Sequence, residues 1–178
     1  ILSRITPKRT DKLISQCKSC NFNAIRVWGG GYYPDDFFYN SCDRAGLVVF
    51  QDMMFACCAM PSDEDMHEEI RFECIDALKR IRHHACIAVI SGNNEVEELL
   101  DEARIAERKT YLKIFEDMIP ALVKELCPDI PYVPSSPSTC GHFVDPANEN
   151  YGDSHYWEVW HGGKPFAEYR NHYFRYLS

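Results

Sequence analysis

One carboxylate in this chain stands where an acid–base catalyst could work. Glu95 follows an apolar run, 86–90, and a short polar stretch that ends in Asn94. Strands in barrel enzymes present their catalytic groups at that end. A general acid needs partial desolvation to stay protonated near neutral pH, and Asn94 can hydrogen-bond a substrate without adding charge. The same stretch also fits a helix start, with Asn93 or Asn94 as the N-cap and Glu95 beside the helix dipole.

A second candidate group surrounds a run of glycines. Arg26 and Trp28 lie in the apolar run 24–28, which the three glycines at 29–31 end. Glycines let backbone approach a ligand closely, and an indole offers the flat apolar face on which sugars stack. The glycines lack the ending of a phosphate-binding loop, and a tight turn explains them equally well. Arg26 on a buried strand needs a partner, which Glu95 or a neighbouring carboxylate could supply.

Two further groups follow predicted strands. Asp52 ends the run 47–52, where it could bind a hydroxyl or pair with Arg26. An aromatic cluster is formed by His155, Tyr156, Trp157 and Trp160. Such clusters line sugar sites, but they also serve as ordinary core and lid packing.

The elements that position these groups alternate along the chain. Strands are predicted at 24–28, 47–52, 86–91, 131–135, 153–157 and 174–178, and helices at about 7–21, 35–46, 63–83, 108–126 and 166–173. The stretch 136–150 predicts a loop over the active face. The alternation indicates an α/β fold with a parallel sheet, either an open doubly wound sheet or a barrel.

The distribution of polar groups favours the barrel. Polar and aromatic candidate residues stand at the ends of at least four different predicted strands, whereas an open sheet would concentrate them near one switch point. About six strand–helix units are predicted in residues 1–178, whereas a closed (β/α)8 TIM barrel needs eight. The chain is therefore expected to form one domain, an incomplete catalytic barrel.

Composition narrows the class of partner. The chain has 178 residues, 46% of them hydrophobic, and a net charge of −8 without a basic stripe, so nucleic acid is not an expected partner. No apolar run approaches the ~20 residues that span a bilayer, so no membrane partner is expected. Nine cysteines with a single CxxC pair, Cys17 and Cys20, favour reduced thiols in a cytoplasmic compartment. A Cys/His metal protein is the alternative, although a zinc site needs a second matched pair.

Taken together, these segments resemble the β-mannosidase branch of glycoside hydrolase family 2. The matching segments are WGGG at 28–31, DDFFYNSCDRAGLVVFQDMMFAC at 35–57, RIRHHAC at 80–86, SGNNE at 91–95, PYVPSSP at 131–137 and GDSHYWEVWHGGKPF at 152–166. They follow the family's order over nearly the whole chain, which departs at Phe50, where Trp is usual, and at Ala85, where Pro is usual. The family surrounds a (β/α)8 barrel with β-sandwich domains, so the resemblance implies barrel strands two through seven here.

The resemblance implies an exo-acting, retaining enzyme that releases terminal β-D-mannose and uses no cofactor or metal. Glu95 matches the acid/base, and the nucleophile is expected directly after Ser178, whose lead-in matches 176–178. The candidate substrate-binding residues are Arg26, Trp28, Asp52, Asn94, His155, Tyr156 and Trp157. A β-galactosidase, β-glucuronidase or exo-glucosaminidase, and a non-catalytic carbohydrate-binding remnant, stay as alternatives.

Overall fold

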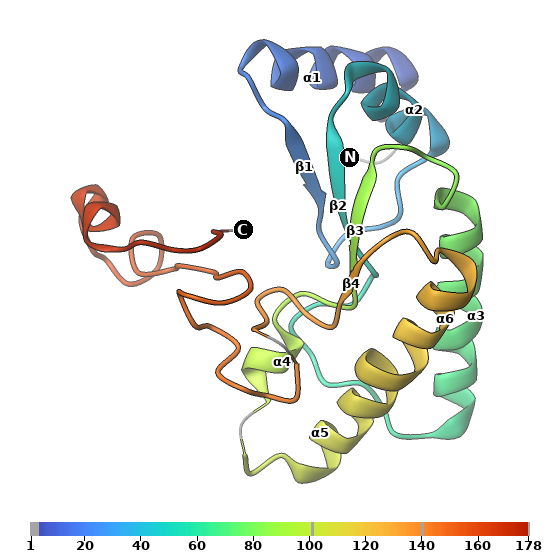
Figure 1. The fold of residues 1–178 in the computed structure, drawn as a ribbon, viewed down its shortest axis with the longest axis vertical. Helices are drawn as coiled ribbons and strands as arrows, with labels where there is room; N and C mark the ends of the chain where they lie inside the picture. The colour runs from blue at the N-terminus through green and yellow to red at the C-terminus, as the bar shows by residue number, and fades with distance from the viewer. Residues whose placement is uncertain (1–3, 101, 140, 178) are drawn as a thin grey trace.

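A parallel sheet forms the centre of the computed structural model, which describes residues 4–100, 102–139 and 141–177 (Figure 1). The strands are β1 (Ala24–Val27), β2 (Val48–Asp52), β3 (Ile87–Ser91) and β4 (Tyr132–Val133). They lie side by side in chain order, and each neighbouring pair is parallel. The predicted α/β class is therefore confirmed. All these strands direct their carboxyl ends to one edge of the sheet.

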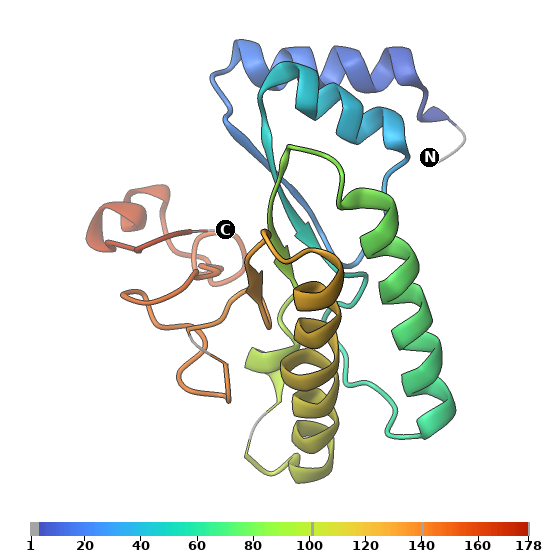
Figure 2. The same cartoon turned by 45° about the vertical axis from the view of Figure 1, so that its right-hand side comes forward.

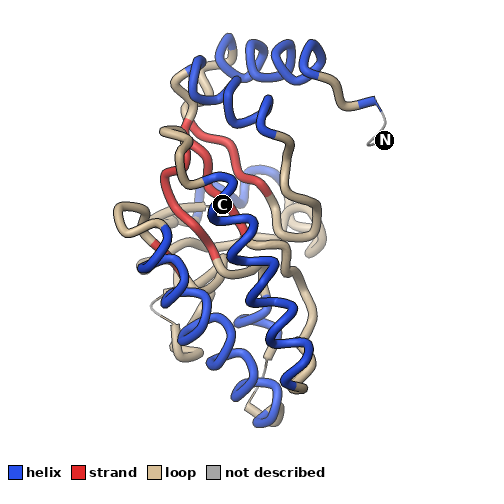
Figure 3. Tube along the Cα trace, turned by 90° about the vertical axis from the view of Figure 1, so that its right-hand side faces the viewer, coloured by secondary structure: helices blue, strands red, loops and turns tan. Residues whose placement is uncertain are grey.

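Helices connect the strands. They are α1 (Pro7–Ser19), α2 (Asp36–Ala45), α3 (Glu64–Ile81), α4 (Val96–Leu99), α5 (Ile105–Tyr111), the π-helix η2 (Leu112–Met118), α6 (Ile119–Leu126) and the 3-10 helix η3 (Phe166–Asn171). Helices α1 and α2 pack together, as do α3 and α6. Helix α3 and the continuous α5–η2–α6 segment cover one side of the sheet, and the C-terminal segment lies on the other (Figure 2). Seen from the helix side, α3 and α6 stand in front of the strands (Figure 3).

Local chemistry sets the helix ends. Thr6 caps α1 by accepting the N–H of Arg9, and Pro7 occupies the first helical position. Gly46, at φ +69°, ends α2 in the left-handed conformation that glycine adopts without strain. Asp63 caps α3 by accepting the N–H of Met66. These boundaries lie close to the predicted ones because caps are short-range signals.

A single apolar core fills the space between the sheet and the helices. Its fully buried members include Val49 of β2, Ile90 of β3, Leu78 and Ile81 of α3, and Phe115 of η2. The core thereby fixes the strands whose ends carry the candidate site. No helix in the described ranges is long and apolar enough to cross a membrane.

Two predicted strands were wrong. The segment 153–157 forms isolated bridges through Asp153 to Ser138 and through Ser154 to Leu177, and 174–177 has only the latter bridge. A strand needs a neighbour in register over several residues, and here the neighbouring segments are loops. Ser178 lies outside the described residues. An open sheet and part of a barrel share a four-stranded parallel core, so the strands alone do not select the barrel.

Candidate functional site

The site residue Glu95 lies beyond the end of β3, between two flanking loops. The N–H of Asn94 donates to the carbonyl of Phe55 (2.9 Å), and the N–H of Glu95 donates to the carbonyl of Ser136 (2.9 Å). Parallel bridges join Asn94 to Ala56 on one side and to Ser136 on the other. The sheet thus continues locally past β3 and holds the backbone of both candidate residues from two sides.

Of the two asparagines that the sequence offered as a cap for this helix, the structure selects Asn93 and not Asn94. Asn93 supplies the capping amide, because its Oδ1 accepts the N–H of Val96 at 3.0 Å. Glu95 precedes α4 with φ 61° and ψ 8°, a left-handed conformation that is uncommon for a glutamate, and its side chain makes no cap hydrogen bond. The side chains of Asn94 and Glu95 are therefore directed to other partners.

The carboxylate of Glu95 is held by two ring N–H groups. Oε1 lies 2.6 Å from Nδ1 of His155 and accepts from Nε1 of Trp157 at 3.1 Å, while Oε2 lies 3.3 Å from Sγ of Cys57. Burial raises the pKa of Glu95, but these hydrogen bonds outweigh it and leave the pKa below the usual value for glutamate. The described residues thus favour the charged form of Glu95, whereas a general acid requires the protonated form.

Arg26 pairs with Asp52 and not with Glu95. Its Nη2 donates to Asp52 Oδ2 at 2.8 Å and its Nε to Oδ1 at 3.3 Å, and the N–H of Gly29 donates to Oδ2 at 3.0 Å. The carboxylate of Asp52 is fully buried, and burial raises its pKa although Arg26 and Gly29 act in the opposite direction. Of the two roles predicted for Asp52, the structure shows the ion pair.

Arg26 also organises the residues beside Glu95. Its Nη2 donates to Asn94 Oδ1 at 2.9 Å, and its Nη1 lies 3.1 Å from Nε2 of His155. Because a guanidinium only donates, Nε2 of His155 accepts, and the ring hydrogen sits on Nδ1, which faces Glu95. A continuous chain of hydrogen bonds therefore runs from Asp52 through Arg26 and His155 to Glu95.

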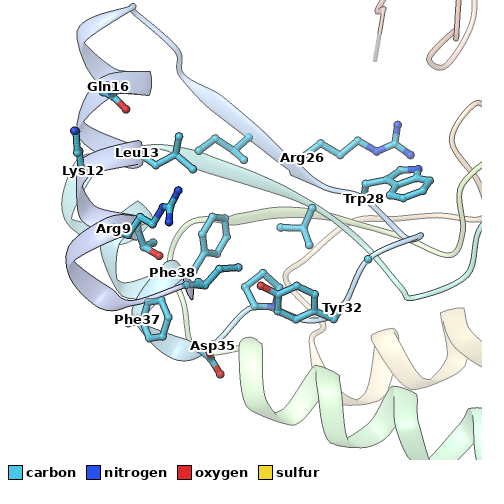
Figure 4. Close-up of a pocket in the computed structure, with 16 residues that line it drawn as sticks. Arg9, Lys12, Leu13, Gln16, Arg26, Trp28, Tyr32, Asp35, Phe37 and Phe38 are labelled. Carbon is cyan, nitrogen blue, oxygen red and sulfur yellow. The ribbon is translucent and has the colours of Figure 1, made fainter. Parts of the chain in front are cut away.

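Two of the predicted aromatic residues lie apart from this chain. Tyr156 directs its hydroxyl to Nε2 of His172 at 2.9 Å and packs against Tyr169. Trp28 is half exposed and lies over Gly30, where a Cβ would come within 2.0 Å of the indole. The indole lines an open cavity of about 740 Å³ that also borders α1 and the start of α2 (Figure 4).

Two contributors to the site were not predicted from the sequence. Cys57 contacts the carboxylate of Glu95, and Ser136 lies 3.1 Å from Nε2 of His155. The only sequence signal for both was their place in the segments that carry the family resemblance. Among the described residues, no group of three or more His, Cys, Asp or Glu side chains is placed to hold a metal ion.

Replacing Gly29 with alanine should disrupt this site through the backbone. The added Cβ would lie 2.5 Å from the carbonyl oxygen of Phe55 and 2.7 Å from that of Met53, so the turn must shift and pull its N–H from Asp52. We expect a loss of about 1–3 kcal/mol, measured by urea unfolding. Gly31→Ala is the matched control, because its nearest neighbour is at 3.3 Å. Equal losses for the two variants would contradict the steric argument.

Comparison with solved structures places the fold among glycosidases. A β-D-mannosidase from Dictyoglomus thermophilum has a TM-score of 0.89 and 35% identity, over 98% of this chain and 22% of that chain. A β-glucuronidase from Bifidobacterium dentium has a TM-score of 0.70 over 93% of this chain and 26% of that one. Its identity is 15%, which shows a shared fold alone.

Sequence comparison then points to one branch of these enzymes. Beta-mannosidase B of Aspergillus niger is 35% identical over 175 residues, which cover 91% of this chain, and that of Aspergillus clavatus is 38% identical over 151 residues, which cover 78%. No protein-family profile matches the chain. The resemblance to the β-mannosidase branch of glycoside hydrolase family 2 is confirmed. The chain spans about a fifth of the length of these relatives, 20% and 18%.

Proposed function

We propose that this chain is the part of a retaining, exo-acting β-mannosidase that carries the acid/base, Glu95. The observation that supports the proposal most directly is the placement of this carboxylate. It lies past the end of a central parallel strand and is oriented by His155 and Trp157, with the Arg26–Asp52 pair behind His155. Carboxylates placed in this way carry out glycoside hydrolysis in barrel enzymes.

We further propose that the sheet is part of a (β/α)8 barrel. Strand β1 is the first strand of the sheet, and the cavity beside Trp28 is lined by the consecutive residues 25–28 (Figure 4). Because side chains alternate between the two faces of a strand, a cavity lined by consecutive residues follows the strand's edge. The rest of its lining mixes apolar side chains such as Leu13 and Phe38 with charged ones such as Arg9. Strands and β-sandwich domains elsewhere in the parent protein would adjoin this chain.

The mechanism needs Glu95 in two protonation states. It protonates the leaving oxygen in the first step and removes a proton from water in the second, while a second carboxylate forms the glycosyl-enzyme. We propose that this nucleophile follows Ser178, about 5–5.5 Å from Glu95 as retention requires. The N–H of Ser154 donates to the carbonyl of Tyr176 at 2.9 Å, which brings this part of the chain close to His155.

The second carboxylate also resolves the protonation problem. A negative charge at that distance raises the pKa of Glu95 against the hydrogen bonds that lower it. Once the nucleophile is glycosylated its charge is lost, so the pKa of Glu95 falls again and the residue can act as a base. The hydrogen bonds from His155 and Trp157 therefore suit the second step, and the nucleophile's charge suits the first.

The free thiols support a cytoplasmic location as part of this proposal. The eight cysteines among the described residues are free, and Cys42, Cys74, Cys86 and Cys127 are buried. Unpaired cysteines in such number are typical of proteins from reducing compartments.

The choice of sugar is tested with the full-length protein and a panel of aryl glycosides. We expect kcat/KM for 4-nitrophenyl β-D-mannopyranoside to exceed the values for the β-galactoside, β-glucuronide and β-glucosaminide by at least about tenfold, because a site that binds specific hydroxyls rejects their epimers. NMR should show β-mannose as the first product if the configuration is retained. A preference for another glycoside, or α-mannose as first product, contradicts the proposal.

A further inference from the structure

Cys57 lies against the proposed acid/base with a fixed backbone. It is in the loop after β2 with φ 55°, and its N–H donates to the carbonyl of Asn94 at 2.9 Å. Its Sγ is 3.3 Å from Oε2 of Glu95 and 3.4 Å from Nδ2 of Asn94. The sulfur therefore bridges the two side chains that the sequence places at the end of β3.

The direction of each hydrogen bond follows from the chemistry of its partner. Arg26 only donates, so the atom of Asn94 that faces it is Oδ1, and the amide nitrogen must face Cys57. The sulfur accepts from this amide. The carboxylate of Glu95 only accepts, so the Cys57 thiol donates its hydrogen to Oε2. The thiol thus links the Arg26–Asn94 contact to Glu95 by a second route, separate from His155.

We infer that Cys57 is a positioning residue that orients Oε2 of Glu95 toward the reacting sugar oxygen. The inference rests on the proposed function of Glu95. Oε1 is held by two N–H donors, whereas Oε2 receives the thiol. A thiol is a weak donor, so it fixes the orientation of the carboxylate and yields easily when a glycosidic oxygen or a water replaces it. Two strong donors on the same oxygen would hinder that exchange.

The charges around Glu95 set the expected pH effect. His155 and Cys57 face its carboxylate, Glu98 interacts with it through charge, and Arg26 lies behind His155. The thiol hydrogen bond lowers the pKa of Glu95. Loss of that bond raises the pKa, so the protonated acid persists to higher pH. The basic limb of the pH profile should then move upward.

The activity test compares Cys57→Ala, Cys57→Ser and Cys58→Ala in the full-length protein. We expect Cys57→Ala to lower kcat about three- to tenfold and to shift the basic limb upward by about half a pH unit, as loss of one modest hydrogen bond implies. Cys57→Ser keeps a donor and should retain most of the rate. Cys58 adjoins Cys57 in the chain and is exposed like it, so it serves as the matched control. Unchanged kcat and an unmoved limb in Cys57→Ala would overturn the inference.

A second test does not depend on hydrolysis. Burial and the contact with Glu95 raise the pKa of the Cys57 thiol. Glu95→Gln removes the negative charge, so in a Cys58→Ala background iodoacetamide should alkylate Cys57 several-fold faster than when Glu95 is present, as read by mass spectrometry. Equal rates would mean that the contact is not made and would overturn the inference. If labelling is faster in Glu95→Gln but the protein that keeps Glu95 hydrolyses no β-mannoside, the contact is supported and the proposed function fails.

Discussion

Glu95→Gln in the full-length protein will lower kcat/KM for unactivated β-mannosides by about 10²–10⁴-fold, the usual contribution of a positioned acid–base group. Glutamine is nearly isosteric and can still accept from His155 and Trp157, so the loss reports proton transfer and not a collapsed site. The basic limb of the pH–rate profile should vanish, because the group whose deprotonation produces it is gone. Steady-state kinetics from pH 4 to pH 9 measures both effects.

Azide distinguishes a missing base from a damaged site. With an activated 2,4-dinitrophenyl β-mannoside the first step needs little acid, so the glycosyl-enzyme of Glu95→Gln should accumulate and react with azide to give β-mannosyl azide. Glu98→Gln, in the short helix α4 that directly follows Glu95, is the control and should stay within about threefold of the unmodified protein, since it removes no acid–base group. Full activity in Glu95→Gln would refute the assignment of Glu95.

The short-range features of this fold were predictable from the sequence. Caps such as Thr6 and Gly46 and the apolar runs of β1 to β3 are signals carried by a few neighbouring residues. Glu95 could be found because it stands just past such a run, after a short polar stretch. The predicted strand 153–157 failed because residues of strand-like composition, His155 and Trp157 among them, are used to contact Glu95 instead of forming a ladder.

The contacts that define the site were less predictable, since they join residues far apart in the chain. Arg26 and His155 are separated by 129 positions, and Cys57 and Glu95 by 38. Both Cys57 and Glu95 also have positive φ, which no residue preference indicates for these types. The sequence offered Asp52 and Glu95 as possible partners of Arg26, and only the packing of β1 beside β2 selects Asp52.

Arg26→Met should be the most destabilising of the substitutions considered, costing about 3–5 kcal/mol in unfolding free energy. The Arg26–Asp52 pair has a 2.8 Å contact, and its aspartate is fully buried, so removal of the guanidinium leaves an uncompensated charge. Arg44→Met tests the role of burial, because the Arg44–Asp11 pair has nearly the same contact distance, 2.9 Å, with both side chains more than half exposed. That variant should cost less than about 1 kcal/mol. Urea unfolding measures the loss of unfolding free energy in both variants, and hydrogen exchange of the β1 amides provides a second measurement.

The unfolding free energy that Arg26→Met loses should depend on pH, and this dependence distinguishes an effect of charge from an effect of packing. Burial already raises the pKa of Asp52, and loss of Arg26 raises it further. The folded variant then binds a proton at Asp52 more tightly than the unfolded chain does, in which the aspartate pKa is about 3.9. The loss of unfolding free energy should be largest above the raised pKa of Asp52. It should shrink as the pH falls toward the pKa of this aspartate in the unfolded chain. Adding Asp52→Asn should recover part of the loss at neutral pH by removing the buried charge. A deficit that is equal at pH 5 and pH 8 and unaffected by Asp52→Asn would mean that Arg26 acts through packing alone.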